Sequence, residues 1–169
     1  MDRDSIQTHG LLHFGDYMTT DAGFNSRAAH AAEIGGAGGI ANARSLAGMY
    51  APLANGGSHN GVTIVDEDTL TVMGRTASAV EVDTMLLFPT HFGLGFMKNM
   101  DNRRQPPGRQ SSAVLSDSAF GHVGAGGSIG FADPKIKMSF GYSMNRMGPG
   151  LLLNERGQAL IDAASSALE

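Results

Sequence analysis

The chain has 169 residues, of which 41% are hydrophobic and 17% charged, and this length and composition predict a single domain with a buried core. A formal charge of -4, with no Lys/Arg cluster beyond Arg103-Arg104, argues against nucleic acid or an anionic membrane as a partner. The sequence contains no cysteine, which excludes disulfides, thiolate metal ligands and cysteine nucleophiles.

The N-terminal residues "MDRDSIQTHGLLHFGD" carry charges where a signal peptide would need an uninterrupted apolar core. No run elsewhere reaches the roughly 20 apolar residues of a membrane-spanning helix. We therefore expect a soluble chain without a signal peptide or membrane span, and take the cytoplasm as the default compartment.

Residues 1–30 have mixed polarity and no sustained period, and we expect a loop-rich lead-in with at most one short helix. Residues 31–57 read as a glycine-rich loop followed by a helix that ends at Asn55-Gly56-Gly57, with Pro52 in its last turn. The apolar residues that recur every three or four positions are Ile40, Ala43, Leu46, Met49, Tyr50 and Leu53.

Residues 58–84 are mixed in pattern. The stretch "VTIVDEDTLTVMG" within them predicts a strand and then a helix whose N-cap is Asp66 or Asp68.

Residues 85–147 are predicted to form antiparallel strands, interrupted by a polar loop at about 98–113. Three stretches alternate between apolar and small or polar residues: "HFGLGFM", "GGSIGFAD" and "KIKMSFGYSMN", the last of them over ten residues. Asp133-Pro134 lies between the second and third and predicts the turn of a hairpin.

Residues 148–169 return to helical spacing, with Asn154 as the expected N-cap of a closing helix. Its predicted apolar face consists of Leu160, Ile161, Ala164 and Leu168. The pattern as a whole predicts an α+β fold in one partial domain, with an antiparallel sheet flanked by helices.

The pentapeptide Gly126-Gly127-Ser128-Ile129-Gly130 matches the G-x-S-x-G nucleophile elbow of many esterases. An elbow serine lies in a turn from a strand into a helix, and its catalytic histidine follows it in the chain. Here a strand is predicted after Ser128, and all six histidines precede it. We therefore interpret Ser128 as a polar residue on a strand, next to glycines that allow close approach of another backbone.

Three further motifs are weak. Gly35–Ala41 loosely fits a dinucleotide-binding loop but lacks a preceding strand, so a plain glycine-rich loop is the better interpretation. His9 and His13 have the i, i+4 spacing of a metal pair, but Gly10 between them and the lack of a third ligand favour a surface pair. We assign no role to Ser116-Asp117-Ser118, which resembles the S-D-N element of penicillin-recognising enzymes, and expect neither a metal nor a cofactor.

The stretch "FGHVGAGGSIGFADPKIKMSFGYSMNRM" resembles the C-terminal part of the serine β-lactamase and penicillin-binding-protein superfamily, in its esterase-like branch related to class C enzymes. His122-Val123-Gly124 lies where that family carries K-T-G or H-x-G on the strand beside the active site. Upstream, "NSRAAHAAEIGGAGGIANARSLAGMYAPLANGG" resembles the family's segment with a helix that runs into N-G-G, and "LNERGQALIDAASSAL" resembles its closing helix. The resemblance covers most of residues 24–168 and implies a partial β-lactamase/transpeptidase-like fold.

The resemblance also implies roles for individual residues. The backbone amide of Ala125, just after the triplet, would donate to the oxyanion of the substrate. His122 would orient or polarise the nucleophile and the substrate carbonyl. Val123, Gly124 and Gly126 would lie along the bound substrate, where a larger side chain could block it.

The sequence departs from the family at its nucleophile. None of the three lysines completes an S-x-x-K motif, and no tyrosine completes Y-x-N. We therefore expect a C-terminal region of a β-lactamase-like serine hydrolase that acts on ester or amide substrates but is inactive alone, and that self-associates or pairs with a missing N-terminal portion. The alternative is a non-catalytic interaction or structural domain derived from that fold.

Overall fold

The structure is a computed structural model and describes residues 5 and 23–168. It divides into two compact units, one of residues up to 41 with 84–87, the other of residues 42–83 and 88–169. The first unit contains η2 (Gly23–Asn25) and α2 (Arg27–Ala31), whose N-cap is Ser26. Whether the two units form one domain, as the length predicts, stays a prediction.

The second unit begins with helix α3 (Ala43–Ala54), which confirms the predicted helix and its stop at Asn55. Its N-cap is Asn42, whose Oδ1 accepts a hydrogen bond of 2.9 Å from the backbone N–H of Ser45. The predicted start was too early, because Ile40 lies before the cap and is 70% exposed. Pro52 lies in the last turn, and the helix ends two residues later at Ala54.

Strands β1 (Ser58–His59) and β2 (Val62–Thr63) form a short hairpin that leads into helix α4 (Glu67–Gly74). The predicted strand followed by a helix is thus confirmed. Of the two predicted caps the structure selects Asp66, whose Oδ1 accepts a hydrogen bond of 2.6 Å from Thr69 N–H. In this position a carboxylate also interacts favourably with the positive end of the helix dipole.

The central sheet contains β5 (Phe120–Val123), β6 (Ile129–Asp133) and β7 (Met138–Tyr142) in the order β5-β6-β7, all antiparallel. The hairpin predicted around Asp133-Pro134 is therefore confirmed. The ten-residue strand predicted from "KIKMSFGYSMN" is too long, because residues 134–137 form a turn that carries Lys137 to a φ of 52°. The alternation begins inside this turn, where Ile136 is 43% exposed.

Strands β3 (Ser78–Val80) and β4 (Thr90–Phe92) pair with each other. The prediction of one continuous strand in "HFGLGFM" is wrong. The chain reverses after β4, with Gly93 N–H donating to Phe96 O at 2.8 Å, and Met97 then pairs with both Phe92 and Gly121. Because Gly95 has a φ of 78°, the turn places a glycine in the left-handed region that other residues avoid.

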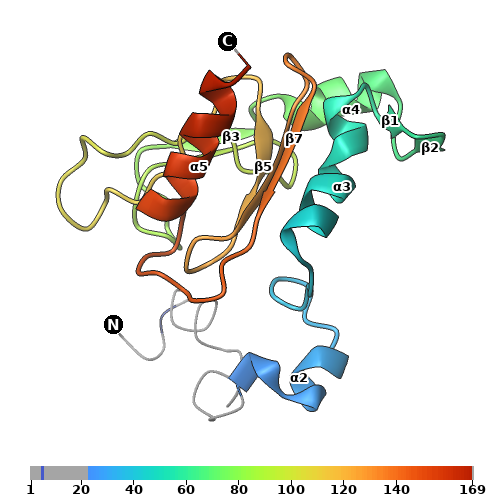
Figure 1. The fold of residues 1–169 in the computed structure, drawn as a ribbon. Coiled ribbons are helices and arrows are strands. Elements are labelled where there is room, and N and C mark those ends of the chain that lie inside the picture. The colour runs from blue at the N-terminus through green and yellow to red at the C-terminus, as the bar shows by residue number, and fades with distance from the viewer. Residues whose placement is uncertain (1–4, 6–22, 169) are drawn as a thin grey trace. The chain divides into compact units, whose positions relative to one another are not determined.

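Helices α3 and α5 lie on opposite sides of the central sheet (Figure 1). On the α3 side, two glycines that face each other across β6 and β7, Gly130 and Gly141, allow the helix to approach closely. A Cβ at Gly141 would come within 2.7 Å of the backbone nitrogen of Ala47 in α3. The core on this side consists of Tyr50, Leu53, Ala54, Leu70, Phe120 and Ala132.

Helix α5 (Glu155–Ser166) closes the chain, and its N-cap Asn154 accepts a hydrogen bond of 3.3 Å from Gly157 N–H. The cap prediction is confirmed, and the predicted apolar face is partly wrong. Ile161 is buried, whereas Leu160 and Leu168 are 48% and 59% exposed. Within the described residues no helix is long and apolar enough to cross a membrane.

Candidate active site

Of the residues that the sequence singled out, His122 and Val123 end strand β5, and the others lie in the loop that joins β5 to β6, residues 124–128. Gly124 N–H donates to Ser128 O at 2.8 Å, and Gly127 N–H donates back to Gly124 O at 3.0 Å. Gly126 and Gly127 have φ values of 85° and 109°, which L-residues rarely adopt. The backbone conformation of this loop therefore favours glycine at positions 126 and 127.

Ala125 lies at the tip of this loop and is exposed. Its backbone N–H has no hydrogen-bond acceptor among the described residues, while the amides of Gly124, Gly126 and Gly127 on either side are all engaged. An oxyanion donor must be a fixed N–H that is free to meet the substrate. The amide that the resemblance assigns to this role has both properties.

His122 lies on β5, and its side chain is exposed. Its Nδ1 lies 2.8 Å from the carbonyl oxygen of Val123. Because a carbonyl only accepts, Nδ1 carries the proton in the neutral ring, and Nε2 presents its lone pair as an acceptor. The imidazole is thus held in the tautomer that can accept a hydrogen bond from a hydroxyl.

Tyr50 of α3 supports β5 at the same place and was not identified from the sequence. Its side chain is 5% exposed, and its ring packs against Gly130, the register partner of His122 on the neighbouring strand. Burial raises the pKa of the Tyr50 hydroxyl, and its interaction with the polar backbone of His122 opposes this only in part. The sequence shows this tyrosine as one of several apolar positions in a helix, and nothing there separates it from the others.

The remaining predicted site residues differ in accessibility. Val123 and Gly126 are buried, and Gly124 is half-buried. Gly126 is bound on both sides by the loop before α5: its N–H donates to Gly150 O at 3.2 Å, and its O accepts from Gly148 N–H at 2.9 Å. Contact of these three residues with a substrate stays a prediction.

The serines of the two alternative motifs, Ser128 of the G-x-S-x-G match and Ser116 and Ser118 of the S-D-N-like element, are engaged in structural contacts. Ser128 leads into strand β6, and its Oγ fills the space beside Gly124 where a Cβ would lie. Ser116 and Ser118 donate their hydroxyls to the carboxylate of Asp133, which is 1% exposed. The two serines of the Ser116-Asp117-Ser118 motif thus satisfy a buried charge.

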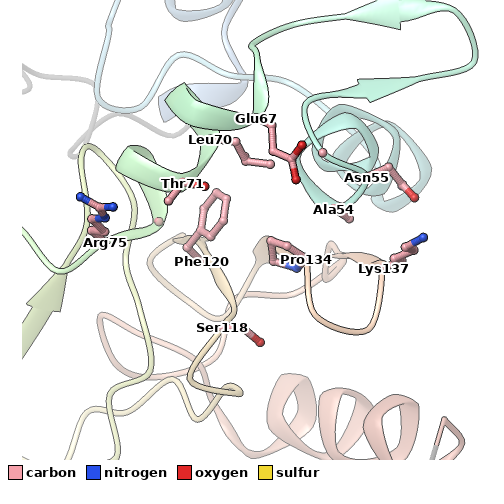
Figure 2. Close-up of a pocket in the computed structure, with 12 residues that line it drawn as sticks. Ala54, Asn55, Glu67, Leu70, Thr71, Arg75, Ser118, Phe120, Pro134 and Lys137 are labelled. Carbon is pink, nitrogen blue, oxygen red and sulfur yellow. The ribbon is translucent and has the colours of Figure 1, made fainter.

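A separate pocket of about 510 Å³ lies near the other end of β5, between α4 and the β6–β7 turn (Figure 2). Phe120 and Leu70 line its apolar side, and Glu67, Arg75 and Lys137 are its charged residues. None of the predicted site residues lines it. Within residues 23–168, no three His, Asp or Glu side chains gather as a metal site would require, and His9 and His13 lie outside the described residues.

Residues 3–165 match the family model described as Beta-lactamase. The chain belongs to the beta-lactamase family. The resemblance stated from the sequence is thereby confirmed, together with the partial α+β fold that it implies.

Individual members of the beta-lactamase family are similar to the chain over much of its length. It is 37% identical over 124 residues to "Esterase/beta-lactamase LipL" of Mycobacterium tuberculosis strain ATCC 25618 / H37Rv, which is 73% of this chain and 26% of that protein. A family VIII carboxylesterase structure matches with a TM-score of 0.71 at 36% identity, over 84% of this chain and 36% of the other.

Two further solved structures agree. A penicillin-binding protein homologue from Caulobacter crescentus matches with a TM-score of 0.63 at 31% identity, over 75% of this chain and 32% of its own. EstA from Arthrobacter nitroguajacolicus Rue61a matches with a TM-score of 0.77 at 26% identity, over 99% of this chain and 42% of its own. The 169 residues thus span about a quarter of the curated relative's length and well under half of each solved structure.

Proposed function

We propose that this chain supplies one wall and one oxyanion donor of an acyl-transfer site in a β-lactamase-like serine hydrolase. The observation that carries the proposal is the Ala125 amide, which is exposed and without an acceptor among the described residues. It follows directly after the His122-Val123-Gly124 triplet, at the end of a strand that α3 holds through Tyr50.

The reaction divides into two steps. A serine oxygen attacks the substrate carbonyl carbon while its proton passes to a base, and the carbonyl oxygen becomes an oxyanion that accepts from Ala125 N–H. The bond to the leaving alcohol or amine then breaks as that group takes the proton from the base. Water later attacks the acyl carbon, which releases the acid and restores the serine hydroxyl. His122 Nε2, held as an acceptor, orients the attacking hydroxyl or the substrate.

These 169 residues contain no S-x-x-K motif that could supply the nucleophile. A serine would have to stand three positions before a lysine, and the residues three positions before the three lysines are Gly95, Ala132 and Pro134. We propose that the serine is supplied by residues outside them, and that the chain alone does not turn over substrate. The substrate class is small esters or amides, which the names of the esterase and β-lactamase relatives support.

Hydrolysis and covalent labelling test the proposal together. The purified chain is incubated with a chromogenic short-chain ester, a chromogenic β-lactam and a fluorophosphonate probe. We expect no burst, no acyl-enzyme and no labelled serine. Ser128→Ala is the matched variant, because an elbow serine would lose both activity and label on this change. Covalent labelling of any serine overturns the claim that the nucleophile lies elsewhere.

One observation favours the second candidate, a non-catalytic interaction domain. Among the described strands β7 pairs only with β6, and all five of its residues are half-buried, so it leaves a sheet edge that another chain can extend. Size-exclusion chromatography at several concentrations separates the two functions. A self-sufficient interaction domain elutes as one defined species, whereas a region that needs a missing N-terminal portion self-associates as concentration rises.

A further inference from the structure

We infer that Asn154 is a positioning residue that holds the loop carrying the Ala125 amide in place, in addition to capping α5. The inference rests on the proposed function, in which that amide meets the oxyanion. It concerns a side chain 29 positions further along the chain (154 − 125) that no motif assigns.

Both polar atoms of the Asn154 amide are used, and in different directions. Oδ1 accepts from Gly157 N–H at 3.3 Å in the first turn of α5. Nδ2 donates to Gly126 O at 2.8 Å in the loop between β5 and β6. A single planar group therefore ties the start of a helix to the residue next to Ala125.

The surrounding backbone leaves room for this amide only because it consists of glycines. A Cβ at Gly148 would lie 2.5 Å from Asn154 Nδ2, and a Cβ at Gly127 would overlap the same atom. The carbonyl of Gly126 is also bound by Gly148 N–H at 2.9 Å, so two donors converge on one oxygen. Such convergence fixes the orientation of the Gly126 peptide more tightly than one bond would.

Capping alone does not explain the second bond. An N-cap needs only an acceptor for the N–H groups of the first turn, which Ser, Thr, Asp and Asn all provide. At the start of α3, Asn42 caps through Oδ1, while its Nδ2 has no acceptor among the described residues. Asn42 is therefore a natural control, an asparagine cap without a loop to hold.

The test separates the two bonds by substitution. Asn154→Asp and Asn154→Ser keep an oxygen that caps α5 but remove the donor to Gly126 O, whereas Asn154→Ala removes both. Amide hydrogen exchange is measured by NMR on the full chain. We expect Gly126 N–H to exchange at least about tenfold faster in Asn154→Asp and Asn154→Ser, with a shifted Ala125 amide resonance. Exchange at Ile161 in α5 stays at the wild-type rate, and Asn42→Asp leaves Gly126 unchanged.

A wild-type exchange rate at Gly126 in both Asn154→Asp and Asn154→Ser overturns the inference and leaves Asn154 as a cap alone. Having two variants keeps this outcome readable if one of them does not fold. Because exchange needs no turnover, the result is independent of the hydrolase proposal. A labelled serine would overturn the hydrolase proposal and leave the role of Asn154 in the loop intact. An unchanged exchange rate at Gly126 would overturn the role of Asn154 and leave the hydrolase proposal intact.

Discussion

The ring of Tyr50 occupies the space that a side chain at Gly130 would need. A Cβ at Gly130 would lie 2.5 Å from Cε2 of Tyr50 and 2.9 Å from its Cδ2. Gly130 is the register partner of His122, so the same ring that packs on β6 brings its hydroxyl to the backbone of β5. One aromatic side chain thus links helix α3 to the strand that carries the candidate site.

Gly130→Ala is expected to destabilise the protein. The added methyl group would force Tyr50 or the strand to move, and such overpacking costs about 1–3 kcal/mol of unfolding free energy. Urea unfolding followed by circular dichroism measures the change. Gly48→Ala in α3 is the control, since a Cβ there meets nothing within 4 Å and alanine favours a helix over glycine. Equal stability of the two variants would contradict this account of the packing.

The raised pKa of Tyr50 predicts a loss of stability at high pH. Because burial raises the pKa of Tyr50 above its usual value of 10.0, the folded state keeps the proton when the unfolded state has lost it. The contribution of Tyr50 to the unfolding free energy is therefore unchanged below pH 10, and the stability falls as the pH rises past that value. Urea unfolding between pH 8 and pH 11 should show a shallower fall in Tyr50→Phe than in the wild type.

Tyr142→Phe, which changes a half-buried tyrosine of β7, is the control for this pH series. If the wild type and Tyr50→Phe lose stability with the same slope, the tyrosine is not responsible for it.

The buried carboxylate of Asp133 predicts a stability defect in Asp133→Asn. It accepts from the hydroxyls of Ser116 and Ser118 and from Lys135 N–H at 3.0 Å. An amide removes the charge that strengthens these bonds and replaces one acceptor oxygen with a donor, at a cost of about 1–3 kcal/mol. The control is Asp117→Asn, because that neighbouring carboxylate is exposed. Unfolding midpoints that shift equally in both variants would contradict a special role for the buried residue.

The sequence allowed prediction of those elements whose signals are local. Capping residues Asp66 and Asn154 and the turn at Asp133-Pro134 are read from a few adjacent residues, and the structure confirms each. Strand lengths were less predictable. The strand predicted from "HFGLGFM" is broken by the turn at Gly95, after which Met97 pairs with Gly121, a contact between segments 24 residues apart (121 − 97) that no local pattern encodes.

The candidate site was predictable only as far as its motif extends. The His122–Gly124 triplet and Ala125 were assigned through a family resemblance, and the structure places them at one strand end. The residues that hold them, Tyr50 in α3 and Asn154 at the N-cap of α5, are distant from them in sequence. Both side chains act through contacts with residues distant in sequence. A hydrophobic period or an N-cap pattern predicts the local role of such a residue but does not predict its distant contact.

Gly127→Ala should be more damaging than another substitution at a glycine with positive φ. Alanine at a φ of 109° is strained, at a cost of about 1–2 kcal/mol, and its Cβ would also overlap Asn154 Nδ2. Gly108→Ala is the matched control: its φ is 87°, but a Cβ there meets nothing within 4 Å. We expect Gly108→Ala to show the strain alone and Gly127→Ala to add at least about 1 kcal/mol from the displaced amide. Chemical denaturation compares the two, and equal losses would mean that the amide yields freely to the new methyl group.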